Sequence, residues 1–296
     1  MKNKEEEILV IGNSRMDYLA QSGQEDDFSV VSQGNFYKTS GGLGRNVSEN
    51  LARLHDNVSF ITALGNDADG QEIESSLSGI GVKVYKIATS YPTSIYNSIS
   101  DSHGKRQAAL IDNRCLTQVK PSELKPLSLL LTTIKHVVIE ASLNEKVIDY
   151  LFKNYPDHYF YCEGVSVSDV RKLRKHLKDI YLFKSNYDEA ISILQAQMEP
   201  EEAVKQIMKE GCPNVVISHT ELPIYYGNKG LVYREPILVR QNVTRTNGVG
   251  DALFAGIVHC LSKKVSLIKA VKFGLNMSYC TLGVDTAVDT DIARIL

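Results

Sequence analysis

Short apolar segments alternate with helical segments through the second half of the chain. The apolar segments are "HVVIEA", "YFYCEG", "YLFKSN" and "NVVISH", which begin at residues 136, 159, 181 and 214. Each but the last precedes a helical pattern of about ten or more residues, the length that a crossover between parallel strands needs. Segments so apolar are buried on both faces. The alternation therefore predicts an α/β fold, a doubly wound and mainly parallel sheet with helices on both faces.

Two further strands of this sheet are predicted in the first half of the chain. Residues 8–12, "ILVIG", and 58–65, "VSFITALG", are short apolar runs that each end at a glycine. Between them Val47, Leu51 and Leu54 recur at helical spacing. This pattern predicts a helix that opens on a glycine turn and packs its apolar face on the sheet.

A second kind of β-structure is predicted near the edge of the sheet. Residues 28–40 mix β-branched, aromatic and polar side chains around Gly34, which is typical of an exposed hairpin, and residues 82–112 have the same texture. No linker rich in Pro, Gly or Ser divides the chain, so we expect a single domain over residues 1–296. Parts of about 13–40 and 82–112 would then form a small β lid over a ligand site.

The charge and hydropathy of the chain argue against several classes of function. A net charge of −2 with 23% charged residues lacks the basic excess of a nucleic-acid or anionic-membrane binder. No apolar run approaches the ~20 residues of a membrane span. The start, "MKNKEEEILVIGNS", is charged and then resembles a buried strand rather than a secretory signal. We therefore expect a cytoplasmic protein with a small-molecule substrate, and no nucleic-acid or membrane partner.

Cysteine and histidine spacing gives no metal or disulfide framework. The cysteines are odd in number and scattered, without a C-x-x-C pair, and no H-E-x-x-H occurs among the histidines. The "SHGKR" segment at residues 102–106 contains Gly-Lys but lacks the upstream glycine of a P-loop, so that reading is excluded.

Two glycine turns, about two hundred residues apart, each open a helical pattern. The first is "GGLGRN" at residues 41–46 and the second is "GVGD" at residues 248–251. Val47 and Leu253 occupy the third-glycine positions, so neither turn completes the dinucleotide fingerprint G-x-G-x-x-G. Asp251 fits two hypotheses. It is a favourable acidic residue in a first helical turn, or it is a base beside an anion site formed by bare backbone N–H groups.

Together with the strand order, these turns resemble the ribokinase-like carbohydrate kinases of the phosphofructokinase-B family. "SGGLGRNVSENLARL" is similar to the first signature of that family, "TNGVGDALFAG" to its second, and "KSNYDEA" to its Asn-x-x-Glu element. The resemblance covers nearly the whole chain and implies the ribokinase-like fold. The Gly-Gly-x-x-Arg-Asn form is most similar to the pseudouridine kinase branch, which phosphorylates the 5′-hydroxyl of a C-linked nucleoside.

The resemblance implies a role in phosphoryl transfer for the second turn. Asp251 would be the general base that takes the proton from the attacking hydroxyl. The backbone of Gly248, Val249 and Gly250 would form an anion hole for the transferring phosphoryl group. Such a transfer needs in-line positioning and preorganised donors, which a helix N-terminus provides.

The resemblance also implies which residues bind the acceptor. Asp17 would clamp sugar hydroxyls, Glu140 would be a further acidic residue on this side, and Asp112 and Asn113 of the lid would touch the base. The first glycine turn would approach the sugar closely, with contributions from Gly41, Gly42 and Asn46. The local alternatives are a turn-forming aspartate for Asp17 and a surface charge at a strand end for Glu140.

On the nucleotide side, the resemblance implies ATP and Mg²⁺ as cofactors. Asn186 and Glu189 match the element that organises water and Mg²⁺, with Glu189 acting on the metal indirectly. Lys184 precedes this element and Ser218 ends the next strand, and both are expected to contact the nucleotide. A helix N-cap with Glu189 in its first turn is the local alternative.

The departures from the family pattern lie mostly around ATP. Thr220 and Pro223 stand where the family has glycines in its nucleotide turn, and proline removes a backbone N–H. Arg245 stands where an acidic residue helps to organise a K⁺ loop, so a K⁺ requirement is not carried over. Arg15 replaces a smaller polar residue, and it would either narrow the sugar pocket or direct specificity toward an anionic group.

Three functions stay open from the sequence. The first is an ATP-dependent pseudouridine kinase, and the second is a ribokinase-like kinase for another sugar or nucleoside. The third is a metabolite-binding protein with weak catalysis on a kinase scaffold. A homodimer through the lid is also open, because the lid edge can be exposed or paired.

Overall fold

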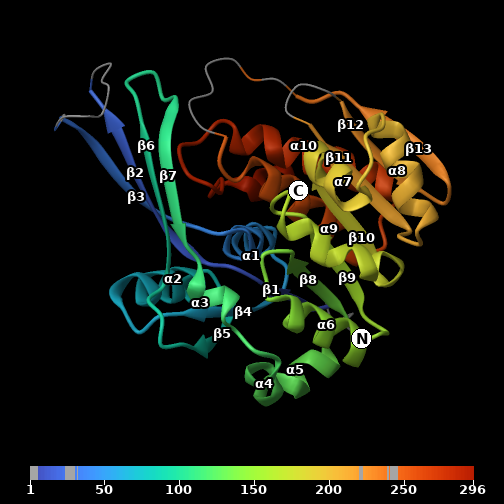
Figure 1. Ribbon diagram of the computed structural model, residues 1–296, viewed down its shortest axis with the longest axis horizontal. Helices are drawn as coiled ribbons and strands as arrows, with labels where there is room; N and C mark the ends of the chain where they lie inside the picture. Colours follow the sequence, from blue (N-terminus) through green and yellow to red (C-terminus); the bar gives the residue numbers. More distant parts are fainter. Residues whose placement is uncertain (1–5, 24–30, 32, 220–222, 239, 241–245) are drawn as a thin grey trace.

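The computed structural model describes residues 6–23, 31, 33–219, 223–238, 240 and 246–296 (Figure 1). Within them, the larger of two sheets has nine strands in the order β13-β12-β11-β10-β9-β8-β1-β4-β5. In chain order these strands are β1 (Ile8–Ile11), β4 (Val58–Leu64), β5 (Lys83–Ala88), β8 (His136–Glu140), β9 (Tyr159–Glu163), β10 (Leu182–Asn186), β11 (Asn214–Ser218), β12 (Ile224–Asn228) and β13 (Leu231–Glu235). Neighbours from β11 to β5 are parallel, while β12 and β13 add an antiparallel edge. The predicted mainly parallel α/β sheet is confirmed.

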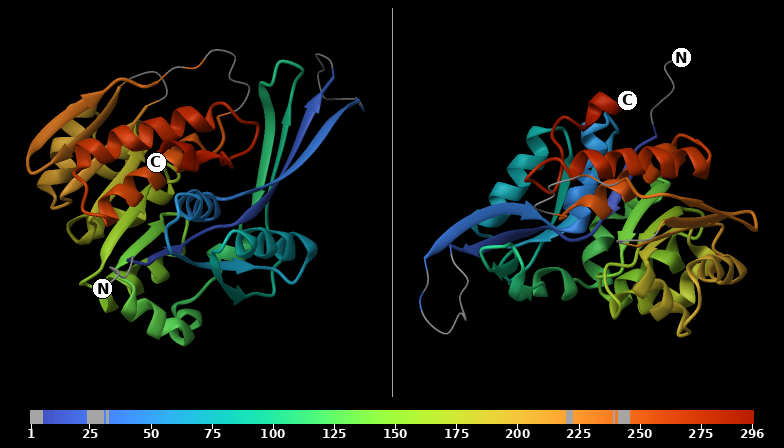
Figure 2. Two further views of the ribbon diagram at one scale, coloured as in Figure 1. Left: turned by 180° about the vertical axis from the view of Figure 1, so that it is seen from behind. Right: turned by 90° about the horizontal axis from the view of Figure 1, so that it is seen from above.

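Helices cover both faces of this sheet, and the red α10 and yellow α8 lie on opposite sides of it (Figure 2, right). One face carries α1 (Leu43–Arg53), α2 (Ala68–Gly79), α9 (Val249–Ser262), α10 (Leu267–Thr281) and η3 (Ile292–Ile295). The other carries α3 (Arg114–Thr117), α4 (Pro121–Leu124), η1 (Lys125–Leu127), α5 (Ser128–Thr133), α6 (Glu145–Asn154), η2 (Asp169–Asp179), α7 (Tyr187–Leu194) and α8 (Pro200–Lys209).

The apolar strands are buried on both sides, as their composition requires. In β1, Ile8 and Val10 point into the core under α1 and α9, whereas Leu9 and Ile11 point into the opposite core. Successive side chains of a strand alternate between faces, so a strand covered on both sides must be apolar throughout. No helix formed by the described residues is long and apolar enough to cross a membrane.

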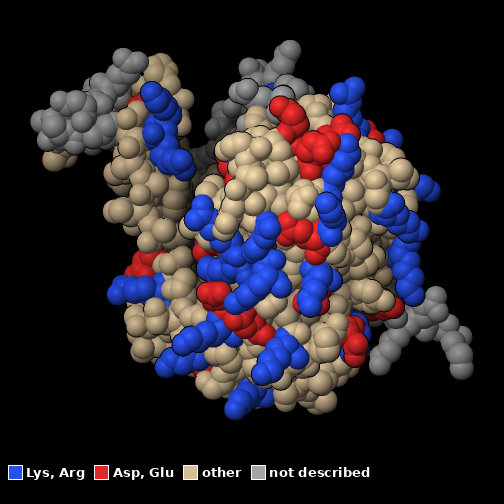
Figure 3. Space-filling view, turned by 45° about the vertical axis from the view of Figure 1, so that its right-hand side comes forward, with Lys and Arg blue, Asp and Glu red and all other residues tan. Residues whose placement is uncertain are grey.

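The second sheet is the lid, which projects from the body as a separate ribbon (Figure 1) and stands apart from it in the space-filling view (Figure 3). Its order is β3-β2-β6-β7, formed by β2 (Arg15–Ser22), β3 (Gly34–Gly41), β6 (Ser94–Ser100) and β7 (Arg106–Asp112). The predicted hairpin centred on Gly34 is wrong: Gly34 begins β3 and lies opposite Ser22 of β2. Residues 24–30 and 32 lie outside the described residues.

The predicted composition of the lid needs one more correction. Residues 83–88 form β5, which pairs with β4 in the large sheet and not with the lid. The connection from β4 to β5 runs through α2, a βαβ unit that continues the parallel sheet. As an edge strand, β5 is only partly covered and keeps polar residues such as Lys83 and Lys86. Its mixture of polar and apolar residues therefore resembles that of the lid strands.

Candidate active site

The candidate site lies where the winding of the large sheet reverses. From β1 the chain builds outward to β4 and β5, whereas from β8 it builds the other way to β11, so β1 and β8 are the neighbours at the switch point. Ligands of open α/β sheets bind at the carboxyl ends of such strands. Gly12 follows β1 there and Glu140 ends β8. A Cβ on Gly12 would lie 3.1 Å from Glu140 Cδ.

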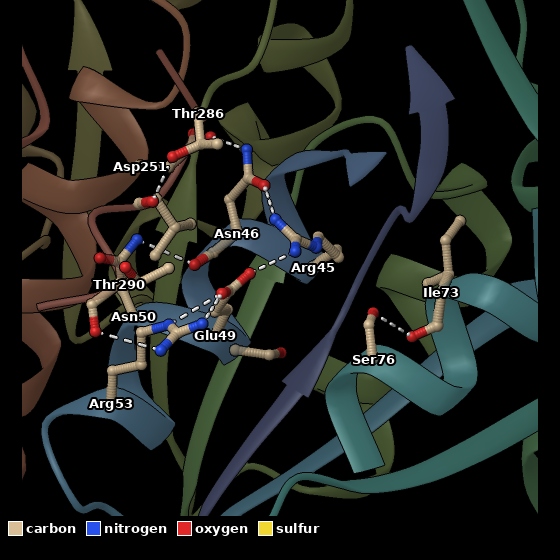
Figure 4. Close-up of polar contacts among 12 residues, drawn as sticks. Arg45, Asn46, Glu49, Asn50, Arg53, Ile73, Ser76, Asp251, Thr286 and Thr290 are labelled. Atoms are coloured by element: carbon tan, nitrogen blue, oxygen red, sulfur yellow. Dashed lines mark hydrogen bonds and ion pairs between the residues drawn. The ribbon is translucent and has the colours of Figure 1, made fainter. Parts of the chain in front are cut away.

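The second glycine turn places Asp251 at the start of α9. Gly248 is the N-cap with φ of 81°, and a Cβ there would lie 1.8 Å from the carbonyl oxygen of Ala287, so only glycine fits. The first-turn N–H groups have no intrahelical acceptor. Asp251 Oδ2 accepts a hydrogen bond from Asn46 Nδ2 at 2.7 Å, which joins the two glycine turns (Figure 4). Burial raises the pKa of Asp251, and the Asn46 bond opposes that rise.

The first glycine turn lies against Asp17. Asp17 is buried within β2, rather than in a turn, and a Cβ on Gly41 would lie 2.6 Å from its Oδ2. Gly42 has φ of 98°, and a Cβ there would lie 2.6 Å from the Asn13 carbonyl oxygen. Gly41 and Gly42 therefore lie beside Asp17, and their contact with a sugar stays a prediction.

Arg15 occupies the same place. Its Nε donates to Asp17 Oδ1 at 2.6 Å, and its guanidinium lies 5.0 Å from the centroid of the Tyr96 ring. The Arg15 charge is thus partly neutralised by Asp17. Of the two effects expected of Arg15, binding of an anionic group is the less favoured, because the cation already has a carboxylate partner, and a narrower sugar pocket stays a prediction.

Glu140 is buried at the switch point. Its Oε1 accepts from the Asn13 backbone N–H and, at 3.0 Å, from the Ser142 hydroxyl, whereas its Oε2 has no hydrogen-bond partner among the described residues. Burial raises the pKa of Glu140 from 4.5 to about 7, against the effect of these two donors. Near neutral pH this carboxyl can therefore both donate and accept.

The raised pKa of Glu140 makes stability depend on pH. The folded state favours its protonated form, so this contribution is full below pH 4.5 and is lost as pH rises through about 7. We expect Glu140→Gln to flatten the fall of Tm across that interval, as measured by thermal denaturation. The exposed Glu145→Gln is the control and should follow the wild type. Parallel curves for wild type and Glu140→Gln would contradict the assignment.

Lys184 and Glu163 form a buried ion pair beside the start of α9, on neighbouring strands. A Cβ on Gly250 would lie 3.2 Å from Lys184 Nζ, so the ammonium lies against the first turn that carries Asp251. Burial lowers the pKa of Lys184, but the charge and hydrogen bond of Glu163, together with the charges of Glu189 and Asp251, outweigh burial and the net pKa is raised. Sequence reasoning missed Glu163. The signal was an acidic residue at the end of an apolar strand, "YFYCEG".

Asn186 and Glu189 form a reciprocal capping box at α7. Asn186 Oδ1 accepts from the Glu189 N–H at 2.9 Å, and Glu189 Oε2 accepts from the Asn186 N–H at 2.9 Å. The helix N-cap that was the local alternative for these two residues is therefore observed. Ser218 lies opposite Asn186 on the neighbouring strand, and its hydroxyl donates to the Ser185 carbonyl at 3.3 Å.

This arrangement fits a metal held mainly by phosphates and water. Within the described residues no three His, Cys, Asp or Glu side chains converge on a metal position. Glu189 presents one buried carboxylate, and a Cβ on Gly164 would lie 2.6 Å from its Oε2. Mg²⁺ in nucleotide sites needs few protein ligands and retains its waters, so a single indirect carboxylate is compatible with it.

The remaining predicted residues are not joined to this cluster. Asp112 forms an ion pair with Arg114 at 2.6 Å, and it lies opposite Ile95, on the lid face away from Asp17. Asn113 occupies the N-cap position of α3 without a side-chain cap bond. Thr220 and Arg245 lie outside the described residues, so the altered nucleotide turn and the K⁺ loop stay predictions, while Pro223 directly precedes β12.

The chain is similar to known kinases in both sequence and fold. The family model "pfkB family carbohydrate kinase" matches residues 5–290. Pseudouridine kinase of Escherichia coli K12 is 23% identical over 292 residues, 97% of this chain and 93% of the relative. Guanosine-inosine kinase of Exiguobacterium acetylicum is 23% identical, with 92% of each chain covered. Ribokinase from Thermotoga maritima superposes with a TM-score of 0.85 at 16% identity, over 97% of this chain and 98% of that one.

Proposed function

Because the chain belongs to the pfkB family of carbohydrate kinases, we propose that it transfers the γ-phosphate of ATP to the 5′-hydroxyl of pseudouridine. The observation that carries the proposal is the position of Asp251. A half-buried carboxylate lies in the first turn of a helix whose first N–H groups have no intrahelical acceptor, and it is hydrogen-bonded to the other glycine turn. A base and an anion site side by side are what phosphoryl transfer to an alcohol requires.

The proposed reaction assigns a separate role to each side of the site. Asp17 accepts hydrogen bonds from the sugar hydroxyls. Asp251 takes the proton of the 5′-hydroxyl while the oxygen of that hydroxyl bonds to the γ-phosphorus. The bond from that phosphorus to the β-phosphate oxygen breaks, and ADP leaves. The anion hole was predicted over Gly248, Val249 and Gly250, but the Val249 N–H donates to the Thr246 carbonyl at 3.4 Å. We therefore assign the oxygens of the transferring group to the N–H groups of Gly250 and Asp251, with the Lys184 ammonium adding positive charge beside them.

Mg²⁺ would supply positive charge on the nucleotide phosphates. Glu189 would orient its water, and the support for this role is a buried carboxylate whose geometry is fixed by Asn186. Both oxygens already accept from Asn186, so Glu189 would act through water rather than as a primary ligand.

The acceptor is the finer part of the proposal. Support for pseudouridine comes from the "GGLGRN" form of the first turn and from the similarity to the Escherichia coli pseudouridine kinase. The guanosine-inosine kinase relative supports a purine nucleoside as the runner-up. Both are nucleosides, which agrees with an Arg15 charge that is already neutralised by Asp17 rather than open to an anionic sugar.

The test is a product assay by mass spectrometry. The purified protein is given Mg·ATP, with and without K⁺, and separately offered pseudouridine, uridine, guanosine, inosine and ribose. Phosphorylated pseudouridine in excess of the other products supports the proposal. A different preferred product keeps the kinase and replaces the acceptor. Binding of an acceptor without any product replaces catalysis by metabolite binding on this scaffold.

We also propose that a second copy of the chain covers the lid. Phe36, Ile99 and Leu110 lie on the lid face away from Asp17, with 83%, 42% and 77% of their surface exposed. Three large apolar side chains that three strands of the lid expose on one face of the sheet are unusual for a surface in water. Light scattering should give the mass of a dimer, and Leu110→Asp should shift it toward the monomer. A monomeric wild-type protein would remove the proposal.

A further inference from the structure

A chain of polar contacts runs from Asp251 along α1 (Figure 4). Asn46 donates through Nδ2 to Asp251 Oδ2 at 2.7 Å, and Arg45 donates through Nη1 to Asn46 Oδ1 at 3.0 Å. The Arg45 guanidinium also pairs with Glu49 one helical turn on. We propose that Arg45 is a positioning residue that fixes the amide of Asn46 and, through it, the carboxylate of Asp251. This inference rests on the proposed role of Asp251 as the base.

The chemistry of the contacts allows only one orientation of the amide. Arg45 has N–H donors and no acceptor, so it must face the Asn46 oxygen. The amide nitrogen is then directed to Asp251, where it donates to the ionised carboxylate. With the amide reversed, Arg45 would face a donor and Asp251 would face an oxygen. Arg45 thereby selects the state in which the base is bound as a carboxylate.

Arg45 is itself held in place. Glu49 pairs with it and also with Arg53 Nη2 at 2.7 Å, and Arg53 Nη1 donates to the Thr290 carbonyl at 3.1 Å. The side chains of Arg45 and Glu49 are only 11% and 7% exposed. Charges so buried are costly unless each is paired. The guanidinium presents its donors in a rigid planar fork that fits a carboxylate and an amide together, whereas a lysine ammonium is a point charge on a flexible stem without that fixed geometry.

A purely structural role is the competing explanation. In that explanation these charges do no more than attach α1 to the segment that contains Thr290. Replacing Arg45 and replacing Arg53 would then have the same effect. They differ in one contact, since Arg45 bonds Asn46 and Arg53 does not. Arg45→Lys and Arg53→Lys are therefore a matched pair: both retain the positive charge near Glu49, and both lose the guanidinium fork.

The expected readout is the acid limb of the pH profile. A hydrogen bond to the charged form of Asp251 lowers its pKa, so its loss moves the acid limb of kcat/KM to higher pH. The other charged groups around Asp251 are Lys184 on β10, Arg15 and Asp17 on β2, Glu140 on β8 and Glu163 on β9, and both variants leave all of them in place.

The experiment measures pH profiles and Tm for the wild type and both variants. For Arg45→Lys we expect kcat to fall about tenfold, the size of one lost bond to a charged group, with the acid limb displaced upward. Arg53→Lys should keep the wild-type profile even if its Tm falls equally. In an Asn46→Ala background, Arg45→Lys should add nothing further, because its effect passes through Asn46.

Equal pH profiles for the two lysine variants would overturn the inference, and so would an undiminished effect of Arg45→Lys in the Asn46→Ala background. The role of Asp251 as the base is tested separately, with the Asp251→Asn variant. If Asp251→Asn keeps its turnover, the role of Asp251 is removed whatever Arg45 does.

Discussion

Asp251→Asn is expected to lower the rate of phosphoryl transfer by about 10²–10⁴-fold, the usual contribution of a positioned general base. The amide cannot accept the proton of the attacking hydroxyl, although it fills the same volume and can still meet Asn46. Acceptor binding should change little, since Asp17 and the first glycine turn are untouched. Rates are measured by product formation, and acceptor affinity by titration calorimetry.

The control for Asp251 tests the simpler hypothesis of a helix-stabilising carboxylate. Glu145 is an exposed acidic residue in the first turn of α6. If Asp251 served only the helix dipole, Asp251→Asn and Glu145→Gln would each cost about 0.3–1 kcal/mol of stability and no activity. A large loss of turnover confined to Asp251→Asn supports the catalytic role. Strong residual turnover would remove it.

Gly248→Ala is expected to damage both activity and stability. The alanine would have to adopt φ of 81° and place its Cβ 1.8 Å from the carbonyl oxygen of Ala287, so the turn must move. Displacing the open N–H groups of an anion hole lowers kcat by about 10²–10³-fold. The left-handed backbone alone costs an alanine roughly 1–2 kcal/mol.

Gly81→Ala separates these two effects. Gly81 also has a positive φ, 91°, but a Cβ there meets no atom within 4 Å. It should lose stability through the backbone alone and keep the wild-type kcat. Steady-state kinetics and thermal denaturation of both variants decide the matter. Equal loss of kcat in the two, or none in Gly248→Ala, would contradict an anion hole at this turn.

The edge strand β5 and the lid show where local patterns were insufficient. Residues 15–22 form β2 because they pair with β3 and β6, although their own sequence, "RMDYLAQS", has no clear strand alternation. The polar texture of β5 reflects its edge position in the large sheet, and no local feature distinguishes that from a lid strand. Strand partnership depends on contacts far along the chain, which composition does not report.

The candidate site divides in the same way. The sequence by itself determined the buried strands, the helix that follows each glycine turn and the place of Asp251 in a first turn, because periodicity and backbone freedom are local properties. Only the tertiary structure decided the Arg15–Asp17 pair, the Lys184–Glu163 pair and the contact of Asn46 with Asp251, 205 residues away. The directions of buried side chains follow from the packing of the whole fold, and a carboxylate acquires its partner and its pKa only there.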